Sequence, residues 1–392
     1  MYDGERRKAN TMASIHDYLY WRADLTFADR PFNDVDNLIL SCLSYLDFMD
    51  IVPTEEQGKG IPLSLACERF LKRANGNIGP YVRSLAKISI EFVELLAQTE
   101  RFGSARLTAY KDIVDNKRSL QFAALCIELP FEGTYVAFRG TDTSLVGWRE
   151  NLMLSYTVTQ AQHEAVSYLE RAVSRIEDSN APIRVGGHSK GGNLAEYAVA
   201  FCPERVRERV RCVYSNDGPG MAPEVLPEDI RAMLGDRLRR IIPTSSVIGM
   251  LFAREHDRHV IVASSATGLE QHDLTTWQVS RDGIIEAPKL LPDCEPINDA
   301  IATWVNSIPL DEREQASNEI FDALESAGAI TIDQVVDSPE RLQRTIRALR
   351  STNERTREVA MALVQLLINK SVNAMRSSVM KTFEDASRKF LE

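Results

Sequence analysis

The sequence has no long uncharged apolar run and no apolar leader. Its most apolar stretch, residues 359–368, is far shorter than the about 20 residues that a membrane-spanning helix needs. The first residues, Met1 to Lys8, are polar, and no apolar stretch with a small-residue cleavage site follows them. These absences predict a cytoplasmic protein without a transmembrane segment.

Cysteine pairs and basic blocks are also missing. No C-x-x-C pair is present to hold zinc or to run redox chemistry, so we expect neither a metal nor a cofactor site. Acidic residues outnumber basic ones by 56 to 46, the net charge is -10, and no Lys/Arg block stands out. A nucleic-acid partner is therefore not expected. The six cysteines, interpreted as reduced and mostly buried thiols, are Cys42, Cys67, Cys126, Cys202, Cys212 and Cys294.

The composition, with 44% hydrophobic and 26% charged residues in 392, is typical of a soluble globular protein. At about 150 residues per domain the length suggests two to three folding units, or one large domain with helical additions. Apolar residues at helical spacing dominate from 34 to 98, and strand signals stop near 292. We predict an N-terminal helical segment (1–104) packing on a core (105–290), followed by a C-terminal helical appendage (291–392).

The core segment alternates between strand-like and helix-like patterns. Three β-type runs bounded by turn residues predict a meander, at 107–110, 122–129 and 134–138. Helices are then expected at 162–177 and 191–201, between strands at 183–187, 211–216, 239–243, 259–264 and 276–280. Such alternation is typical of an α/β protein with a mostly parallel sheet and helices on both faces.

The C-terminal appendage reads as amphipathic helices at 309–327, 339–350 and 353–389. Their apolar stripe can pack on the body of the protein, pair with another chain or contact a lipid surface. Packing within the fold is the ordinary use of such a stripe. Peripheral membrane contact and the oligomeric state stay open.

The most informative segment is residues 183–195, which contains Gly187, Ser189 and Gly191 in the pattern G-x-S-x-G. In a nucleophile elbow a serine occupies a strained turn between strand and helix, and the flanking positions must be small. A β-type run precedes this turn and a helical stripe follows it. The serine here is therefore a candidate nucleophile, whereas a bare match to the pattern could be an ordinary glycine-rich turn.

A serine nucleophile also needs donors for the oxyanion that forms in acyl transfer. The backbone N–H of Lys190, the residue after the nucleophile, is one predicted donor. Thr141, in a glycine-containing turn that follows a strand 48 residues before Ser189, can offer both its N–H and its hydroxyl. We predict an oxyanion hole from these two residues.

These segments together resemble the lipase class 3 branch of the α/β-hydrolases, and more specifically a bacterial family of unassigned function within that superfamily. The resemblance covers about residues 17–280 and implies an α/β-hydrolase fold and serine-hydrolase chemistry, but no substrate. The residues that carry it are Phe138-Arg139-Gly140-Thr141, Trp148, Asn151 and 187–192, with further landmarks at 20–27, 32–41 and 271–273.

The base is sought among six histidines. In α/β-hydrolases the chain order is nucleophile, acid, histidine, which eliminates His16, His163 and His188, the last interpreted as structural. His256 and His259 lie in the charged run 254–259, interpreted as a solvated loop that enters a strand. His272 falls 83 residues after Ser189 in a short turn, where the resemblance also places the base. We predict His272 as the general base.

The acid is harder to assign. The resemblance places it within residues 241–249, where this chain has serines and no carboxylate. Asp217, 28 residues after Ser189 and followed by Gly-Pro-Gly, resembles instead the acid of pancreatic-type lipases, which follows an earlier strand. We predict Asp217 as the triad acid. If it only forms a turn, Ser246 or Asp273 would orient His272.

The sequence thus predicts a serine hydrolase that cleaves acyl or lipid-like esters through Ser189, His272 and Asp217, with Thr141 and Lys190 as oxyanion donors. One alternative is a non-catalytic binding protein with a hydrolase fold, which the departure at 241–249 favours. The other is a thioesterase or peptidase, because the same triad cleaves thioesters and amides.

Overall fold

The computed structural model describes residues 13–84, 86–115, 120–142, 145–254, 256–291, 303, 307–309, 312–329, 333–335, 338–352, 354, 356–357, 360–361 and 364. The chain forms two compact units. The first comprises Met1–Asp142 and Leu154–Cys294, and the second comprises Thr143–Met153 and Glu295–Glu392. Residues 105–290 and the N-terminal helices thus belong to one unit, apart from the short segment 143–153. Most of the helix predicted at 353–389 lies outside the described residues.

Eight strands of the described chain form one sheet in sequential order. Strands β1 to β4 pair antiparallel, and β4 to β8 pair parallel, so the predicted meander leads into the predicted parallel sheet. The strands are β1 (Ile61–Pro62), β2 (Arg106–Asp115), β3 (Leu120–Leu129), β4 (Gly133–Phe138), β5 (Ile183–His188), β6 (Val210–Asn216), β7 (Leu238–Pro243) and β8 (His259–Val262).

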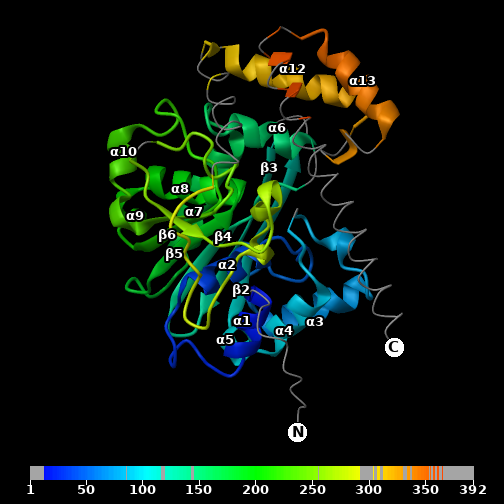
Figure 1. Cartoon of the computed structure of the whole chain (residues 1–392). Helices are drawn as coiled ribbons and strands as arrows, with labels where there is room; N and C mark the ends of the chain where they lie inside the picture. Colours follow the sequence, from blue (N-terminus) through cyan, green and yellow to red (C-terminus); the bar gives the residue numbers. More distant parts are fainter. Residues whose placement is uncertain are drawn as a thin grey trace, which may run out of the picture. The chain divides into compact units, whose positions relative to one another are not determined.

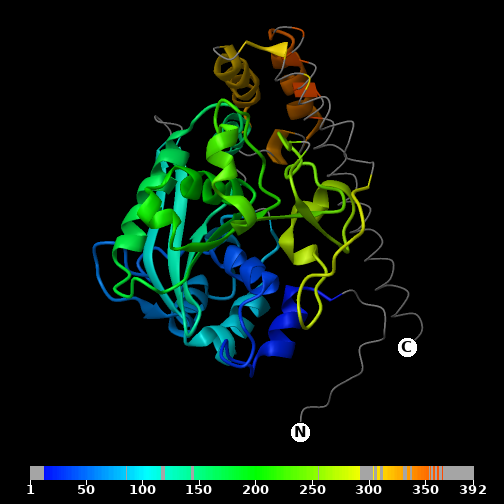
Figure 2. The same cartoon turned by 90° about the vertical axis from the view of Figure 1, so that its left-hand side faces the viewer.

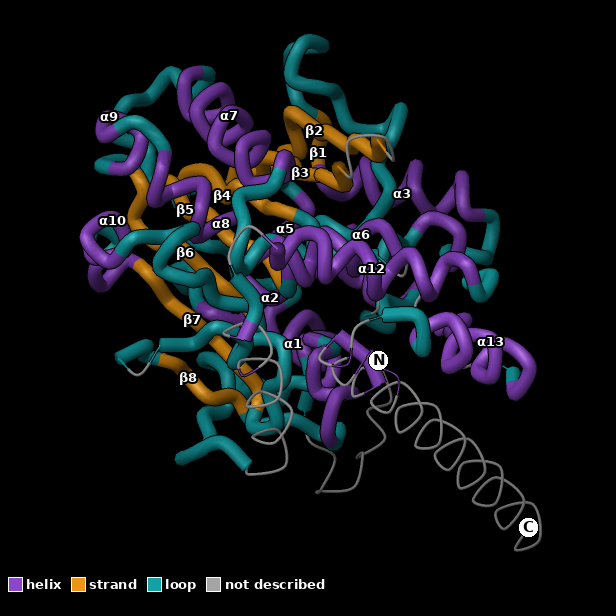
Figure 3. The backbone as a smooth tube through the Cα atoms, turned by 90° about the horizontal axis from the view of Figure 1, so that it is seen from above, coloured by secondary structure: helices purple, strands orange, loops and turns teal. Residues whose placement is uncertain are grey.

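Helices cover both faces of this sheet (Figures 1 and 3). Because right-handed crossovers between strands in sequential order place their helices on one side, α7 and α8 share a face. The N-terminal helices cover the other face, where α2 contacts β4 and β5. The helices of this unit are α1 (Ile15–Arg22), α2 (Asp34–Leu43), α3 (Leu63–Ala74), α4 (Ile90–Gln98), α5 (Glu100–Gly103), α7 (Gln160–Ser174), α8 (Lys190–Phe201), α9 (Glu204–Arg207) and α10 (Glu228–Ala232).

Strand alternation divides the core into two apolar clusters, one on each face. On β4, Val136 and Phe138 pack with α7 and α8, whereas Tyr135 and Ala137 pack with the N-terminal helices. The sheet is therefore buried on both sides, which is the usual state of parallel strands.

A buried ion pair joins the N-terminal helices to the loop between α1 and α2. Arg101 donates to both carboxylate oxygens of Asp36, at 2.7 and 2.6 Å, and its remaining N–H groups reach backbone carbonyls of residues 26–31. Asp36 also accepts from the backbone N–H of Asn33, which in turn caps α2. Removing one partner of such a pair would leave a buried charge uncompensated.

The second unit contains α6 (Leu145–Met153), α12 (Arg313–Ser326) and α13 (Pro339–Leu349). The last two confirm the helices predicted at 309–327 and 339–350 and lie next to each other in Figures 1 and 2. Arg149 of α6 pairs with Asp322 at 2.8 Å and with Glu325 at 3.1 Å, which ties α6 to α12. None of the described helices combines the length and the apolar character needed to span a membrane.

Two predictions about local structure are wrong. Residues 276–280 do not form a strand but only the isolated bridges Ser264↔Trp277 and Val279↔Ile284, because Asp273 caps a tight turn at Leu274–Thr276. The charged run 254–259 is not simply solvated, although His256 is exposed. Asp257 is buried between Arg240, at 3.1 Å, and Arg231.

His259 is the first residue of β8 and pairs with Arg240 of β7 in the sheet register. In this position the imidazole is largely buried. Burial lowers the pKa of His259 from 6.5 to about 4, and the nearby Arg240 adds to the shift. The unfolded chain therefore binds a proton at His259 more tightly than the folded chain does. The contribution of the neutral, buried His259 to the free energy of unfolding is complete above pH 6.5 and is lost as the pH falls toward 4.

We therefore expect the His259→Phe variant to show a flatter stability profile than the wild type. Between pH 7.5 and pH 5 the wild type should lose about 2 kcal/mol more of its free energy of unfolding than the variant does. Urea unfolding at the two pH values measures the difference. Parallel profiles would contradict the lowered pKa of this histidine.

Candidate active site

The turn from β5 into α8 has the backbone of a nucleophile elbow. Ser189 lies between His188 and the first residue of α8 with φ 58° and ψ -128°, a strained combination for a residue with a side chain. Its N–H donates to the carbonyl of Asn216 at 2.9 Å. The strain is thus stabilised by the neighbouring strand, and the serine is held at the carboxyl edge of the sheet.

Glycine is required on both sides of this serine. A Cβ at Gly191 would lie 2.2 Å from the carbonyl oxygen of Phe138, and one at Gly187 would lie 2.4 Å from the same oxygen. The end of β4 therefore touches the first turn of α8. This close contact explains the spacing G-x-S-x-G in physical terms.

Asp217 and His272 are joined by a hydrogen bond. Asp217 follows β6 in a left-handed conformation, with φ 47°, and its Oδ2 lies 2.6 Å from Nδ1 of His272. The aspartate side chain is almost fully buried and the histidine is largely so, with side-chain exposures of 1% and 12%. Two residues 55 positions apart in the sequence thus form the acid–imidazole pair that the sequence predicts.

The serine-rich segment after β7 holds this carboxylate. Ser246 donates its hydroxyl to Oδ1 of Asp217 at 2.5 Å, and the N–H of Gly249 donates to the same oxygen at 3.1 Å. A Cβ at Gly249 would come within 2.4 Å of that oxygen. The segment that lacks a carboxylate therefore supplies donors to a carboxylate from the adjacent strand.

The alternative partners of His272 are engaged elsewhere. Ser246 bonds to Asp217, and Asp273 accepts from the N–H groups of Lys87 and Thr275. The turn that carries His272 is anchored through Gln271, whose amide oxygen accepts from the N–H of Ser245 at 2.9 Å. The acid and the base are therefore both fixed to the end of β7.

His188, the residue before Ser189, packs against His272. The two ring centroids lie 4.4 Å apart at an interplanar angle of 39°. Nδ1 of His188 lies 2.7 Å from the hydroxyl of Tyr45, a residue just after α2. Burial holds the pKa of His188 well below its usual value, so the ring is neutral near pH 7. A neutral ring is the form that tolerates a charged imidazole beside it.

A buried amide pair fixes the strand ends behind the elbow. Asn37 of α2 and Asn216 of β6 exchange side-chain hydrogen bonds of 2.8 and 3.1 Å. Asn216 also donates to the carbonyl of Gly187, and Tyr135 donates to Asn37. The N-terminal helices thus support the elbow from the opposite face of the sheet. Sequence patterns carried no signal for Asn37 or Tyr45 in this role.

The predicted oxyanion donors lie where β4 meets α8. Thr141, 5% exposed, follows β4, and its hydroxyl has no hydrogen-bond partner within the described part of the chain. Arg139 holds the preceding turn through two bonds to Asp112, of 2.7 and 2.8 Å. Lys190 begins α8, and its ammonium donates to the carbonyl of Gln121 at 2.5 Å. No described group of three His, Cys, Asp or Glu side chains could hold a metal ion.

A family model described as Mbeg1-like matches residues 96–322, which is more than half of the chain. The chain belongs to the Mbeg1-like family. Its mostly parallel sheet with helices on both faces confirms the α/β architecture that the sequence predicts. No curated protein sequence matches it.

Solved lipase structures are similar to this Mbeg1-like chain at low identity. The Rhizomucor miehei lipase propeptide complex is 14% identical, with 42% of this chain and 58% of that chain covered and a TM-score of 0.32. The M37 lipase is 15% identical, with 55% of this chain and 69% of that chain covered and a TM-score of 0.35. The Lip2 lipase from Yarrowia lipolytica is 12% identical, with 59% of this chain and 89% of that chain covered and a TM-score of 0.32. This chain thus spans little more than half of the first of these lipases.

The Tyr45–His188 contact predicts an asymmetry between two tyrosines. Tyr45→Phe leaves a buried ring nitrogen without its partner and should lower the free energy of unfolding by about 1–3 kcal/mol. Tyr20→Phe removes an exposed bond to Glu91 and should stay within about 0.5 kcal/mol of the wild type. Chemical denaturation of both variants provides the comparison. Equal losses would show that the buried contact contributes nothing.

Proposed function

We propose that this chain is a serine hydrolase of carboxylic esters, in which Ser189 attacks the ester carbonyl and forms an acyl-enzyme. The observation that carries the proposal is the 2.6 Å bond between Asp217 and His272, whose ring packs on the residue preceding a strained elbow serine. A strained serine and a buried acid at neighbouring strand ends, with an imidazole from a later turn bonded to the acid, are the parts that acyl transfer needs.

In this mechanism His272 first accepts the proton of the Ser189 hydroxyl and later returns it to the leaving alcohol. Asp217 holds the Nδ1–H of the ring, which leaves Nε2 as the base and stabilises the imidazolium that forms. The bonds from Ser246 and Gly249 keep the acid in place. Thr141 and the N–H of Lys190 stabilise the oxyanion.

Labelling by an active-site fluorophosphonate tests the nucleophile and the acid. Ser189→Ala should abolish labelling, and Asp217→Asn should lower the rate by about 10⁴, since the ring loses its orienting acceptor. Asp273→Asn is the matched control, because that carboxylate accepts from the N–H groups of Lys87 and Thr275 and has no bond to His272, so labelling should stay close to that of the wild type. Full activity in Asp217→Asn together with loss in Asp273→Asn or Ser246→Ala would transfer the role of the acid.

The departure that favoured a non-catalytic binding protein has a structural explanation. Residues 241–249 carry no carboxylate, but Ser246 and Gly249 in this segment donate hydrogen bonds to the carboxylate of Asp217. If the fluorophosphonate failed to label the wild-type protein, the result would favour the non-catalytic binding protein. Turnover of acyl thioesters or peptides, measured beside the matching oxygen esters, decides between an esterase and the thioesterase or peptidase that the same residues allow.

We propose further that the acyl group is apolar and several carbons long. Parallel sheets bind ligands beyond the carboxyl ends of their strands, and such sites are mostly apolar. Each methylene buried there contributes about 0.8 kcal/mol, close to a fourfold gain in kcat/KM. A series of p-nitrophenyl esters from acetate to laurate, below micelle formation, should show rising kcat/KM until the site is full. A steady fall from acetate onward would favour a small polar ester.

A further inference from the structure

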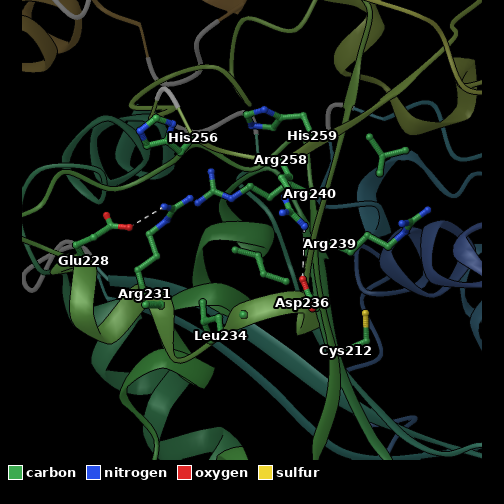
Figure 4. A pocket seen from close by; sticks show the side chains of 14 residues that line it. Cys212, Glu228, Arg231, Leu234, Asp236, Arg239, Arg240, His256, Arg258 and His259 are labelled. Atoms are coloured by element: carbon green, nitrogen blue, oxygen red, sulfur yellow. Dashed lines mark hydrogen bonds and ion pairs between the residues drawn. The ribbon is translucent and has the colours of Figure 1, made fainter.

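A second site is suggested by a cavity of about 490 Å³ around the amino ends of β7 and β8, the edge of the sheet opposite to Ser189 (Figure 4). Its lining includes four arginines and two histidines, which come from α10, from both strands and from the loop between the strands. They are Arg231, Arg239, Arg240, Arg258, His256 and His259, and the lining carboxylates are Glu228 and Asp236.

The sheet register brings the central donors together. Arg240 and His259 are partners on parallel strands, so their side chains emerge on the same face of the sheet. Arg231 reaches the cavity from α10 (Figure 4). A helix and the two strands that follow it thus line one small volume, which lies within the about 300–1,000 Å³ typical of small-molecule sites.

Each of these three side chains has a buried nitrogen without a hydrogen-bond partner among the described residues. The atoms are Nε of Arg231, Nε of Arg240 and Nε2 of His259. Arg240 is 4% exposed, so its free N–H has no ready access to bulk water. A buried donor without an acceptor costs about 1–3 kcal/mol. These nitrogens are covered, so a ligand with several acceptor oxygens reaches them only when the side chains that line the cavity shift.

The ion pairs around the cavity use the terminal nitrogens of Arg231 and Arg240 and leave their Nε atoms unpaired. Arg239 pairs with Asp34. Glu196 and Asp257, both nearly fully buried, bind the terminal nitrogens of Arg240. The carboxylates at the mouth, Glu228 and Asp236, are 70% and 101% exposed, so solvent screens their repulsion of an anion. Arg258, 92% exposed and 3.6 Å from Asp236, makes only a weak surface pair and can turn onto a ligand.

We propose that this cavity binds the phosphate group of a small phosphorylated molecule. Guanidinium groups match phosphate oxygens in geometry and charge, and a phosphate offers more acceptor oxygens than a carboxylate does to donors that arrive from three sides. The volume leaves room for an organic group attached to the phosphate. The proposal does not rest on the esterase chemistry, because the cavity and Ser189 lie at opposite ends of the strands.

Isothermal titration of the full chain with inorganic phosphate and with glycerol 3-phosphate, at constant ionic strength set by sodium chloride, tests the site. Both ligands should bind saturably. His259→Phe removes one donor but keeps an aromatic ring, and should weaken binding about 10-fold. Arg258→Gln at the exposed rim should weaken it about 2- to 5-fold without affecting folding.

Two controls give the result its meaning. Arg69→Gln removes the same charge from an exposed position on α3 and should bind phosphate like the wild type. Ser189→Ala should also bind normally, which separates the cavity from anion binding at the oxyanion donors. Absence of saturable binding would overturn the proposal. So would affinities that fall equally in Arg69→Gln and Arg258→Gln, or binding lost in Ser189→Ala.

Discussion

The close contact between the end of β4 and the first turn of α8 governs the geometry of the candidate active site. Because no Cβ fits at Gly187 or Gly191, the carbonyl of Phe138 can approach the elbow, and Ser189 is held in its strained conformation. The same approach brings the end of β4 to the helix N-terminus, where N–H groups favour negative charge. A single larger side chain at either glycine would force the end of β4 away from the first turn of α8.

The acid and the elbow are held in different ways, although both use buried polar groups. Asp217 receives donors from the loop after β7, whereas Asn216, one residue earlier, is fixed by Asn37 from α2. Adjacent residues are thus bonded to different segments of the chain. The N-terminal helices therefore do more than cover an apolar face. Through Asn37 and Tyr45 they contact the strand end that carries Ser189.

Periodicity and turn chemistry predicted most of the strands and helices, since local apolar patterns follow the faces that are buried. They failed where particular side-chain bonds, rather than local composition, decide the structure. Residues 276–280 have a strand-like composition, but Asp273 forms a turn before them and Gln271 accepts from Trp277. The run 254–259 looks solvated by composition, yet Asp257 is buried because Arg231 and Arg240 converge on it.

The elbow turn, its two glycines and the chain order of Ser189, Asp217 and His272 are determined by the sequence alone, because they express local backbone geometry and chain order. The choice of Asp217 over Ser246 and Asp273 as the neighbour of His272 was decided only by the tertiary structure, since a 2.6 Å bond depends on how two loops meet. The same holds for Tyr45 beside His188 and for the cavity at β7 and β8. Side chains from distant segments acquire a common environment only when the sheet is assembled.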